Sequence, residues 1–253
     1  MDEVLVEVRD GVQVITINRP EARNALNGRV ARGIAAALDE LDETAELRVG
    51  VLTGAGGTFC AGMDLKAFLD GDVPLVEGRG LGGLTEAPPR KPLVAAVEGY
   101  AVAGGFELLL ACDLVVASET ATFGVPEVKR GLVAAAGAAL LLPRRIPQAI
   151  ALEMLLTGEP IDAQRAATLG LVNRVVPEGT AVDAAVELAR VVAANGPLAV
   201  AVTKQIARSA PYWGWDEGWQ KQGELMGPVF VSEDAQEGAR AFAEKRDPVW
   251  KGR

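Results

Sequence analysis

The stretch VAAVEGYAVAGGFELLLACD, residues 94–113, sets the expectations for the whole chain. An apolar run typical of a buried strand enters a turn of small residues, and an apolar helical run leaves it after Gly104 and Gly105. Glu107 lies within this helical run, where an unpaired carboxylate is costly, so it needs partners or a chemical role. The Gly-Gly pair opens the helix with N–H groups that can receive negative charge. The stretch therefore predicts an oxyanion site with an acid or base beside it.

The composition excludes several classes of protein. The 253 residues include no histidine, which excludes Ser-His-Asp and Cys-His catalysis and every histidine-ligated metal site. Cys60 and Cys112 lack metal-like spacing and are interpreted as buried small side chains in a reducing compartment. The net charge of −9 argues against a nucleic-acid partner. The chain has no uncharged run near the ~20 residues of a membrane span and no signal-like N-terminus, so we expect a cytoplasmic protein without a membrane partner.

The order of apolar runs predicts an α/β core followed by helices. Asp10 and Gly11 indicate a hairpin between strands at 4–9 and 12–17. Further strands are expected at 49–53, 92–97, 114–117, 121–123 and 171–176, and helices at 30–47, 137–142, 149–156 and 163–169 and from 180, 198, 216 and 232, with breaks at Gly196-Pro197, Pro211 and Gly227-Pro228. The Gly- and Pro-rich residues 68–90 are expected to form a lid or binding loop. We place a boundary near Asn195, dividing a core (1–195) from a helical segment (196–253).

The glycine-rich residues 54–62, GAGGTFCAG, resemble a nucleotide loop only superficially. A dinucleotide fingerprint beginning at Gly54 would need glycine where Phe59 stands, and a phosphate loop ending at Gly62 would need lysine where Met63 stands. A tight turn from strand to helix is the better interpretation.

Three segments taken in order resemble one known family. They are residues 59–65 (FCAGMDL), 98–113, and 123–127 (FGVPE), and with 23–27 (RNALN) and 241–246 (AFAEKR) the match spans essentially the whole chain. The set is similar to the enoyl-CoA hydratase/isomerase (crotonase) family. The resemblance implies an α/β fold, a crotonase-like spiral of ββα units with a helical C-terminal oligomerisation segment, assembled as a homotrimer or as a dimer of trimers.

The same resemblance assigns roles to particular residues. The two oxyanion-hole amides correspond to Met63 and Gly104, and the paired glutamates of the family's hydratases correspond to Glu107 and Glu127. The coenzyme A portion of the substrate is expected along two loops, at Ala22, Arg23, Ala25, Leu26, Ala61, Asp64, Leu65 and Lys66.

The implied activity is addition of water to a trans-2-enoyl-CoA, giving a 3-hydroxyacyl-CoA, in the breakdown of fatty acids or related acyl groups. The chemistry suits the residues: two N–H groups stabilise charge on the thioester oxygen, one carboxylate takes a proton from water, and the other protonates the α-carbon. It needs no metal and no redox cofactor, and coenzyme A enters only with the substrate. We assign Glu107 to water and Glu127 to the α-carbon; the opposite assignment and a shared proton stay open.

One stretch departs from the hydratase pattern. Residues 134–138 read AAAGA where hydratases usually carry a Pro-Gly-Ala-Gly-Gly-like run, and the added methyl groups restrict the backbone near the expected acyl site. Alternatives on the same scaffold are double-bond isomerisation, thioester hydrolysis and a non-catalytic acyl-CoA-binding oligomer. Asp113 is expected as a cap or ion-pair partner, and the aromatic residues between Tyr212 and Trp219 as packing or a subunit interface.

Overall fold

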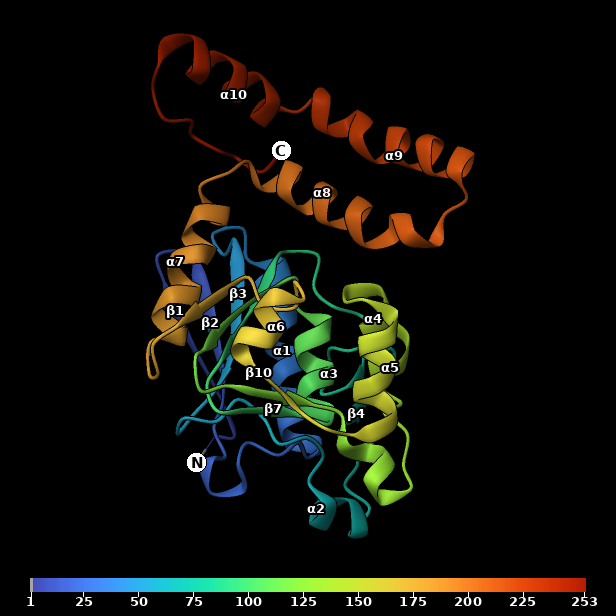
Figure 1. Ribbon diagram of the computed structural model, residues 1–253. Helices are drawn as coiled ribbons and strands as arrows, with labels where there is room; N and C mark the ends of the chain where they lie inside the picture. Colours follow the sequence, from blue (N-terminus) through green and yellow to red (C-terminus); the bar gives the residue numbers. More distant parts are fainter. Residues whose placement is uncertain (1) are drawn as a thin grey trace.

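The computed structural model describes residues 2–253 and is built on one mixed sheet (Figure 1). Its six strands, in the order β1-β2-β3-β6-β8-β11, are β1 (Val4–Arg9), β2 (Val12–Ile17), β3 (Val49–Gly54), β6 (Leu93–Val97), β8 (Leu114–Ser118) and β11 (Arg174–Val176). β1 pairs antiparallel with β2 across the Asp10-Gly11 turn, and the other pairs are parallel. The central strands are continuously apolar because both faces of the sheet are covered.

A second, smaller sheet gives the chain its spiral. Its strands, β7 (Tyr100–Val102), β9 (Thr122–Gly124) and β10 (Ile161–Asp162), lie in the order β10-β9-β7. β6 continues into β7 and then α3 (Gly104–Ala111), and β8 continues into β9 and then a 3₁₀ turn at Pro126–Arg130. β4 (Leu75–Val76) and β5 (Gly80–Leu81) form a short hairpin within residues 68–90. Two successive turns of the chain, β6 to β7 and β8 to β9, therefore each deliver one strand to each sheet, in keeping with the predicted spiral.

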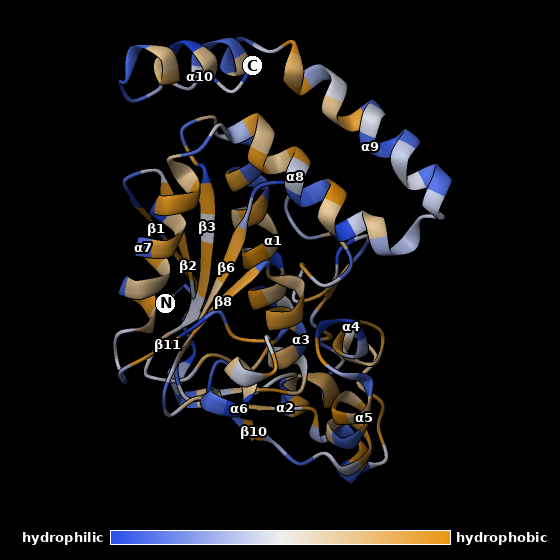
Figure 2. Cartoon of the chain, turned by 45° about the horizontal axis from the view of Figure 1, so that its top comes forward, coloured by the Kyte–Doolittle hydropathy of each residue, from blue (hydrophilic) through white to orange (hydrophobic). Residues whose placement is uncertain are grey.

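Helices cover both faces of the main sheet. α7 (Ala181–Ala193) packs on one face, where Val14, Val51 and Val94 meet its residues Ala185 and Val186. The other face packs against α1 (Gly28–Glu43) and α3. Alternate residues of each strand supply the two faces, and Figure 2 shows these strands as hydrophobic almost throughout.

The remaining helices lie around this core. They are α2 (Leu65–Leu69), α4 (Ala138–Arg145), α5 (Gln148–Thr157) and α6 (Ala163–Thr168), and beyond the sheet α8 (Pro197–Ser209), α9 (Trp215–Phe230) and α10 (Glu233–Glu244). α8, α9 and α10 extend away from the sheet as an arm (Figure 1). Trp215 and Trp219 meet edge to face on α9, and Trp215 is 79% exposed. The arm therefore carries large apolar side chains that this chain does not cover.

Some helix boundaries differ from the sequence prediction. The predicted break at Gly227-Pro228 is wrong, because α9 continues to Phe230. A proline so near the end of a helix removes only one backbone hydrogen bond before the helix stops. α1 begins at Gly28, earlier than predicted, because the Asn27 side chain accepts from the N–H of Val30 and caps the helix there; it also ends earlier than predicted, at Glu43.

No single helix among residues 2–253 has the length and apolar character to cross a membrane. α7 and α8, with the turn that follows α8, pass that test only as a pair, and a bend of 107° separates them.

Candidate active site

The Met63 and Gly104 N–H groups lie at the ends of two adjoining segments. Cys60 forms a parallel bridge with Ala101: its N–H donates to the carbonyl of Tyr100 (2.9 Å), and its carbonyl accepts from the N–H of Val102 (3.1 Å). Met63 and Gly104 each follow their member of this bridge by three residues, so the two turns leave the pairing side by side. The structure therefore brings both predicted oxyanion donors to one end of the small sheet.

A second bridge turns the Met63 N–H away from the protein backbone. Leu26 donates to the carbonyl of Gly62 (2.7 Å) and accepts from the N–H of Asp64 (2.8 Å). In this parallel pattern the residue between, Met63, points its own N–H to the opposite side. Neither that N–H nor the N–H of Gly104, the first residue of α3, has an acceptor among residues 2–253. Two free donors are thus available together.

The two turns are in close contact, and the backbone is strained where they meet. Gly62 has φ +94°, and a Cβ added there would lie 3.0 Å from the Gly104 nitrogen and 2.8 Å from the Ala103 Cβ. Ala103 itself has φ 51° and ψ −129°, a conformation that costs a non-glycine residue of the order of 1–3 kcal/mol. Its N–H donates to the carbonyl of Gly124 at 2.9 Å, which holds it in place. Glycine at 62 is therefore required by both conformation and space.

The pairing of β7 with β9 brings Glu107 and Glu127 together. Val102 lies opposite Gly124 in that pairing, and each strand is followed at once by the element carrying its glutamate, α3 or the 3₁₀ turn. Glu107 is only 4% exposed, and its Oε1 accepts from the N–H groups of Ala136 (2.8 Å) and Ala138 (3.1 Å). The Oε2 of Glu127 is buried and has no hydrogen-bond partner among residues 2–253.

The pKa values of both carboxyl groups are raised above their ordinary values. Burial raises the pKa of Glu107 to about 7, the nearby Glu127 carboxyl adds to the rise, and the two N–H donors oppose it. Burial also raises the pKa of Glu127. A pair of carboxyl groups in this state titrates jointly and can hold one proton between them near neutral pH.

The alanine-rich residues 134–138 have a role that the sequence did not reveal. Their turn lets two N–H groups point at one carboxylate oxygen, and it depends on Gly137, whose φ of 127° is rarely adopted by other residues. The sequence indicated this turn only weakly, by one glycine, Gly137, between an alanine run and a predicted helix.

The loops at 19–27 and 58–66 form one unit held by buried polar groups. Arg19 donates to Asp64 at 2.8 Å and to the carbonyl of Ala25 at 2.6 Å. The fully buried Asn24 accepts from the Arg19 N–H and donates to the carbonyls of Ala55 and Thr58. Arg19 and Asn24 were missed as site residues, because in the sequence they resemble ordinary loop residues.

Asp64 holds a charge in this unit. Burial alone raises its pKa, but the hydrogen bond from Arg19 and the N–H groups of Ala67 and Lys66 outweigh burial and bring the pKa below its ordinary value. The carboxylate also caps α2. These contacts fix Asp64 in place, directly after Met63.

The predicted coenzyme-binding residues lie on these two loops. Ala22, Ala25, Leu26 and Ala61 are partly or fully buried, whereas Arg23, Leu65 and Lys66 are exposed. The side chains of Arg23 and Lys66 have no hydrogen bond or ion pair within the described part of the chain, so both cations are available to an anion. They are the charged groups that a phosphate-bearing ligand would meet.

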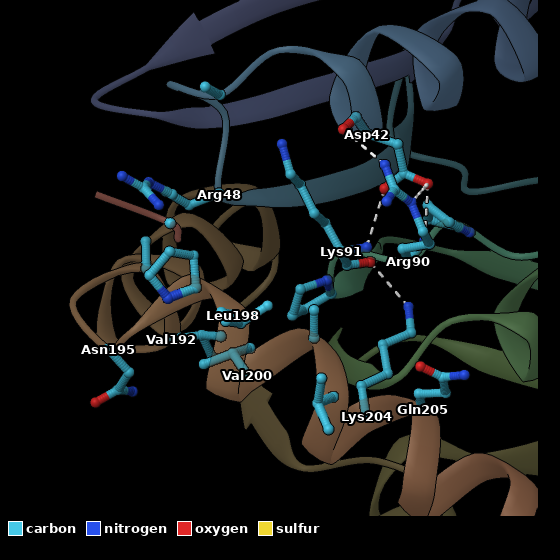
Figure 3. Close-up of a pocket in the computed structure, with 18 of the residues that line it drawn as sticks. Asp42, Arg48, Arg90, Lys91, Val192, Asn195, Leu198, Val200, Lys204 and Gln205 are labelled. Carbon is cyan, nitrogen blue, oxygen red and sulfur yellow. Dashed lines mark hydrogen bonds and ion pairs between the residues drawn. The ribbon is translucent and has the colours of Figure 1, made fainter. Parts of the chain in front are cut away.

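Asp113 is a structural partner, as predicted. It accepts from the N–H of Leu93 (2.8 Å) and pairs with Lys204 (2.6 Å) and Arg208 (2.9 Å) of α8. These pairs border a pocket of about 890 Å³ between the core and α8, where Lys204 also reaches the carbonyl of Lys91 (Figure 3). Neither glutamate lines this pocket, which is at the opposite end of α3. It belongs to the attachment of the arm, not to the candidate site.

Comparison with known proteins identifies the family of the chain. The model of the enoyl-CoA hydratase/isomerase family matches residues 7–253. The chain belongs to the enoyl-CoA hydratase/isomerase family. This confirms the family predicted from the sequence.

Individual members of the family resemble the chain over its full length. It is 43% identical to an enoyl-CoA hydratase of Mycobacterium tuberculosis, covering 99% of this chain and 97% of that protein, and 44% identical to the carnitinyl-CoA dehydratase of Salmonella enteritidis, covering all of both. A crystal structure of an enoyl-CoA hydratase from Mycobacterium tuberculosis H37Rv matches all of both chains with 58% identity and a TM-score of 0.98. The predicted crotonase fold with its helical C-terminal segment is confirmed.

Proposed function

We propose that this protein is an enoyl-CoA hydratase, which adds water to a trans-2-enoyl-CoA to give a 3-hydroxyacyl-CoA. One observation carries the proposal: two free N–H groups and two carboxyl groups of raised pKa converge where the loops of the small sheet end. Oxyanion stabilisation alone would serve several reactions of acyl thioesters. The second carboxyl group favours hydration, because water must lose a proton while the α-carbon gains one.

The N–H groups of Met63 and Gly104 are assigned to the thioester oxygen. Addition of hydroxide to the β-carbon sends negative charge through the double bond to that oxygen, producing an enolate-like state. Donors fixed in advance at this point stabilise the charge as it forms, and one such donor is worth about 3 kcal/mol. The bridge between Leu26 and Met63 supports this role, since it fixes the Met63 N–H before substrate arrives.

Glu107 is assigned to water and Glu127 to the α-carbon. The N–H groups of Ala136 and Ala138 favour the carboxylate form of Glu107, while burial keeps its pKa at about 7, the balance that suits a base working near neutral pH. The unpartnered, buried Oε2 of Glu127 favours a neutral carboxyl that can donate its proton. A proton shared by the pair gives both groups the required state at once.

The coenzyme portion is assigned to the loops at 22–26 and 61–66. Arg23 and Lys66 are exposed and free to meet its phosphates, which matters in a chain of net charge −9. The predicted core of residues 1–195 would hold the whole thioester site. The assignment to fatty-acid breakdown in the cytoplasm follows the substrate class and the two free buried cysteines.

The segment 196–253 is assigned to assembly into a homotrimer or a dimer of trimers. The exposed Trp215 and Phe230 of α9 support this role, because a single chain leaves them in water. Light scattering on the purified protein tests it: a mass of three or six chains is expected, and a monomer would contradict it.

The activity is tested with enoyl-CoA thioesters of several chain lengths, by following loss of the conjugated double bond. Wild type is expected to hydrate at least one of them, and Glu107→Gln and Glu127→Gln are each expected to lower kcat by roughly 10²–10⁴-fold. Glu98→Gln is the matched control, since Glu98 is also buried and its carboxylate accepts from the N–H of Ala181 on α7. It should keep nearly full activity.

Three outcomes would replace the proposal. Conversion of a 3-enoyl-CoA to the 2-enoyl isomer without hydration would indicate an isomerase. Release of free coenzyme A would indicate a hydrolase. Tight coenzyme A binding without turnover of any thioester would indicate a non-catalytic binding protein.

A further inference from the structure

α4 is joined to α3 at both of its own ends, first to the middle of α3 and then to the C-terminus of α3. At one end Glu107 of α3 accepts from the N–H groups of Ala136 and Ala138, where α4 begins. At the other end Arg145, the last residue of α4, donates from Nη2 to the carbonyls of Leu110 (3.0 Å) and Cys112 (2.6 Å), where α3 ends. The two links lie about 10 Å apart along α4, and the second joins the C-terminal ends of both helices.

α4 cannot hold this position by its own stability. It has only eight residues, no side chain caps its start, and Pro143 lies inside it. A helix this short is marginal in water, and the proline removes a backbone hydrogen bond. Its place along α3 must come from packing and from the two links.

Arg145 is an unusual residue for a purely structural contact. It is partly buried, and no carboxylate within ion-pair distance accompanies it among residues 2–253. Burial, followed by the neighbouring Arg208, lowers its pKa. A buried cation without a partner is costly, and the carbonyls at the C-terminus of α3 offset that cost only while the guanidinium stays on them.

We propose that Arg145 is a positioning residue for Glu107: by fixing where α4 lies along α3, it keeps the N–H groups of Ala136 and Ala138 on the Glu107 carboxylate. A slide of α4 breaks both links together, since they join the same two helices. The inference rests on the proposed role of Glu107 in activating water. It assigns a supporting role to Arg145, which does not contact Glu107 itself.

The charge environment of Glu107 makes the effect measurable. Glu127 is the ionisable side chain from the neighbouring 3₁₀ turn that raises its pKa, and Arg130 acts on Glu127. The N–H groups of α4 act in the opposite direction. When those donors move away, the carboxylate loses its support and the pKa of Glu107 rises.

The test uses the full-length protein with Arg145→Met, which keeps the aliphatic bulk and removes the donors. If the two hydrogen bonds weaken together by the equivalent of one donor to a charged group, the pKa of Glu107 rises by about one unit, so the acid limb of the kcat/KM profile is expected to move up by about one pH unit. At pH values below the limb, kcat/KM of Arg145→Met is expected to be about tenfold lower than that of wild type. At pH values above the limb, the two proteins should become similar. A general loss of folded enzyme would lower the rate by the same factor at every pH.

Two arginines serve as controls. Arg144→Met removes the same charge from the neighbouring position, where the guanidinium lies over the ring of Tyr212 instead of α3. Arg208→Met removes a donor to the last carbonyl of α3 from α8, without touching α4. Neither should move the limb, and Arg145→Lys, which keeps a donor, should move it less than Arg145→Met. An equal shift in Arg208→Met would overturn the inference, because it would assign the effect to charge at the end of α3.

A direct titration separates this inference from the proposed function. The carboxyl of Glu107 is followed by isotope-edited infrared spectroscopy, with the band identified by its absence in Glu107→Gln. Its pKa should rise by about one unit in Arg145→Met whether or not any enoyl-CoA is hydrated. An unchanged pKa overturns the role of Arg145, while absence of turnover in wild type overturns the hydratase alone. If Arg145→Met does not fold, the smaller shift in Arg145→Lys decides.

Discussion

Gly62→Ala is expected to damage catalysis much more than folding. The added methyl group would lie 2.8 Å from the Ala103 Cβ and 3.0 Å from the Gly104 nitrogen, and neither neighbour can rotate away. Restoring ordinary contact requires the two turns to separate by about 0.5 Å. That displacement acts on the two N–H groups assigned to the thioester oxygen.

The expected size follows from two separate costs. Placing alanine at the positive φ of Gly62 costs about 1–2 kcal/mol of stability. Displacing an oxyanion donor is expected to cost roughly 10²-fold in kcat, the lower end of the loss found when one such donor is removed. KM should change less than about threefold, because the coenzyme loops keep their own contacts.

Gly57→Ala is the matched control. Gly57 lies in the same loop with φ +76°, and an added Cβ there meets no atom within 4 Å. It therefore carries the conformational cost without the collision. Steady-state assays should give a kcat for Gly62→Ala about 100-fold below that of Gly57→Ala, while the collision lowers its stability by only about 1–3 kcal/mol more. Equal kcat values in the two folded variants would refute the oxyanion assignment.

Three further changes have outcomes set by the same structure. The folded pKa of Glu107, about 7, exceeds its ordinary 4.5, so ionisation destabilises the fold increasingly from about pH 4.5 to 7 and by a constant amount above. Glu107→Gln removes this cost, so the gain in the free energy of unfolding that it gives should be larger at pH 8 than at pH 5, by up to about 3 kcal/mol, measured by urea titration. An equal gain at the two pH values would contradict this. Arg19→Met leaves Asp64 without its guanidinium and should weaken coenzyme A binding about tenfold by calorimetry, while unchanged affinity would separate these loops from the coenzyme. Asp113→Ala leaves two cations unpaired and should lower the free energy of unfolding by about 3 kcal/mol, against less than about 1 for the exposed Asp183→Ala.

The strands were predictable because their signals are local. Continuous apolar runs mark β3 and β6, and Asp10-Gly11 marks the first hairpin. The ends of the helices were harder to predict. Proline usually breaks a helix, but Pro228 lies only two residues before the end of α9 and does not. Asn27 marks the start of α1 through its hydrogen bond from the N–H of Val30, which the sequence does not show.

The candidate site divides in the same way. Glu107 stood out because a carboxylate within an apolar helix is rare, and the family resemblance supplied Glu127 and Met63. Arg19 and Arg145 could not be found, since a buried arginine and a surface arginine read identically in sequence. Their roles depend on contacts over tens of residues, from Arg19 to Asp64 and from Arg145 to Leu110.

Several features of the site are unfavourable when considered singly. The Met63 and Gly104 N–H groups have no acceptor, Ala103 is held in a strained conformation, and the buried Oε2 of Glu127 has no partner among residues 2–253. Folding alone would select against each of them, and independent defects would have no reason to gather where β7 ends. A thioester oxygen would satisfy both donors, and a water between the glutamates would satisfy the orphan oxygen. In the proposed mechanism one bound substrate with its water would account for the donors and the oxygen, and the strain at Ala103 would be the cost of aiming the Gly104 N–H before that substrate arrives.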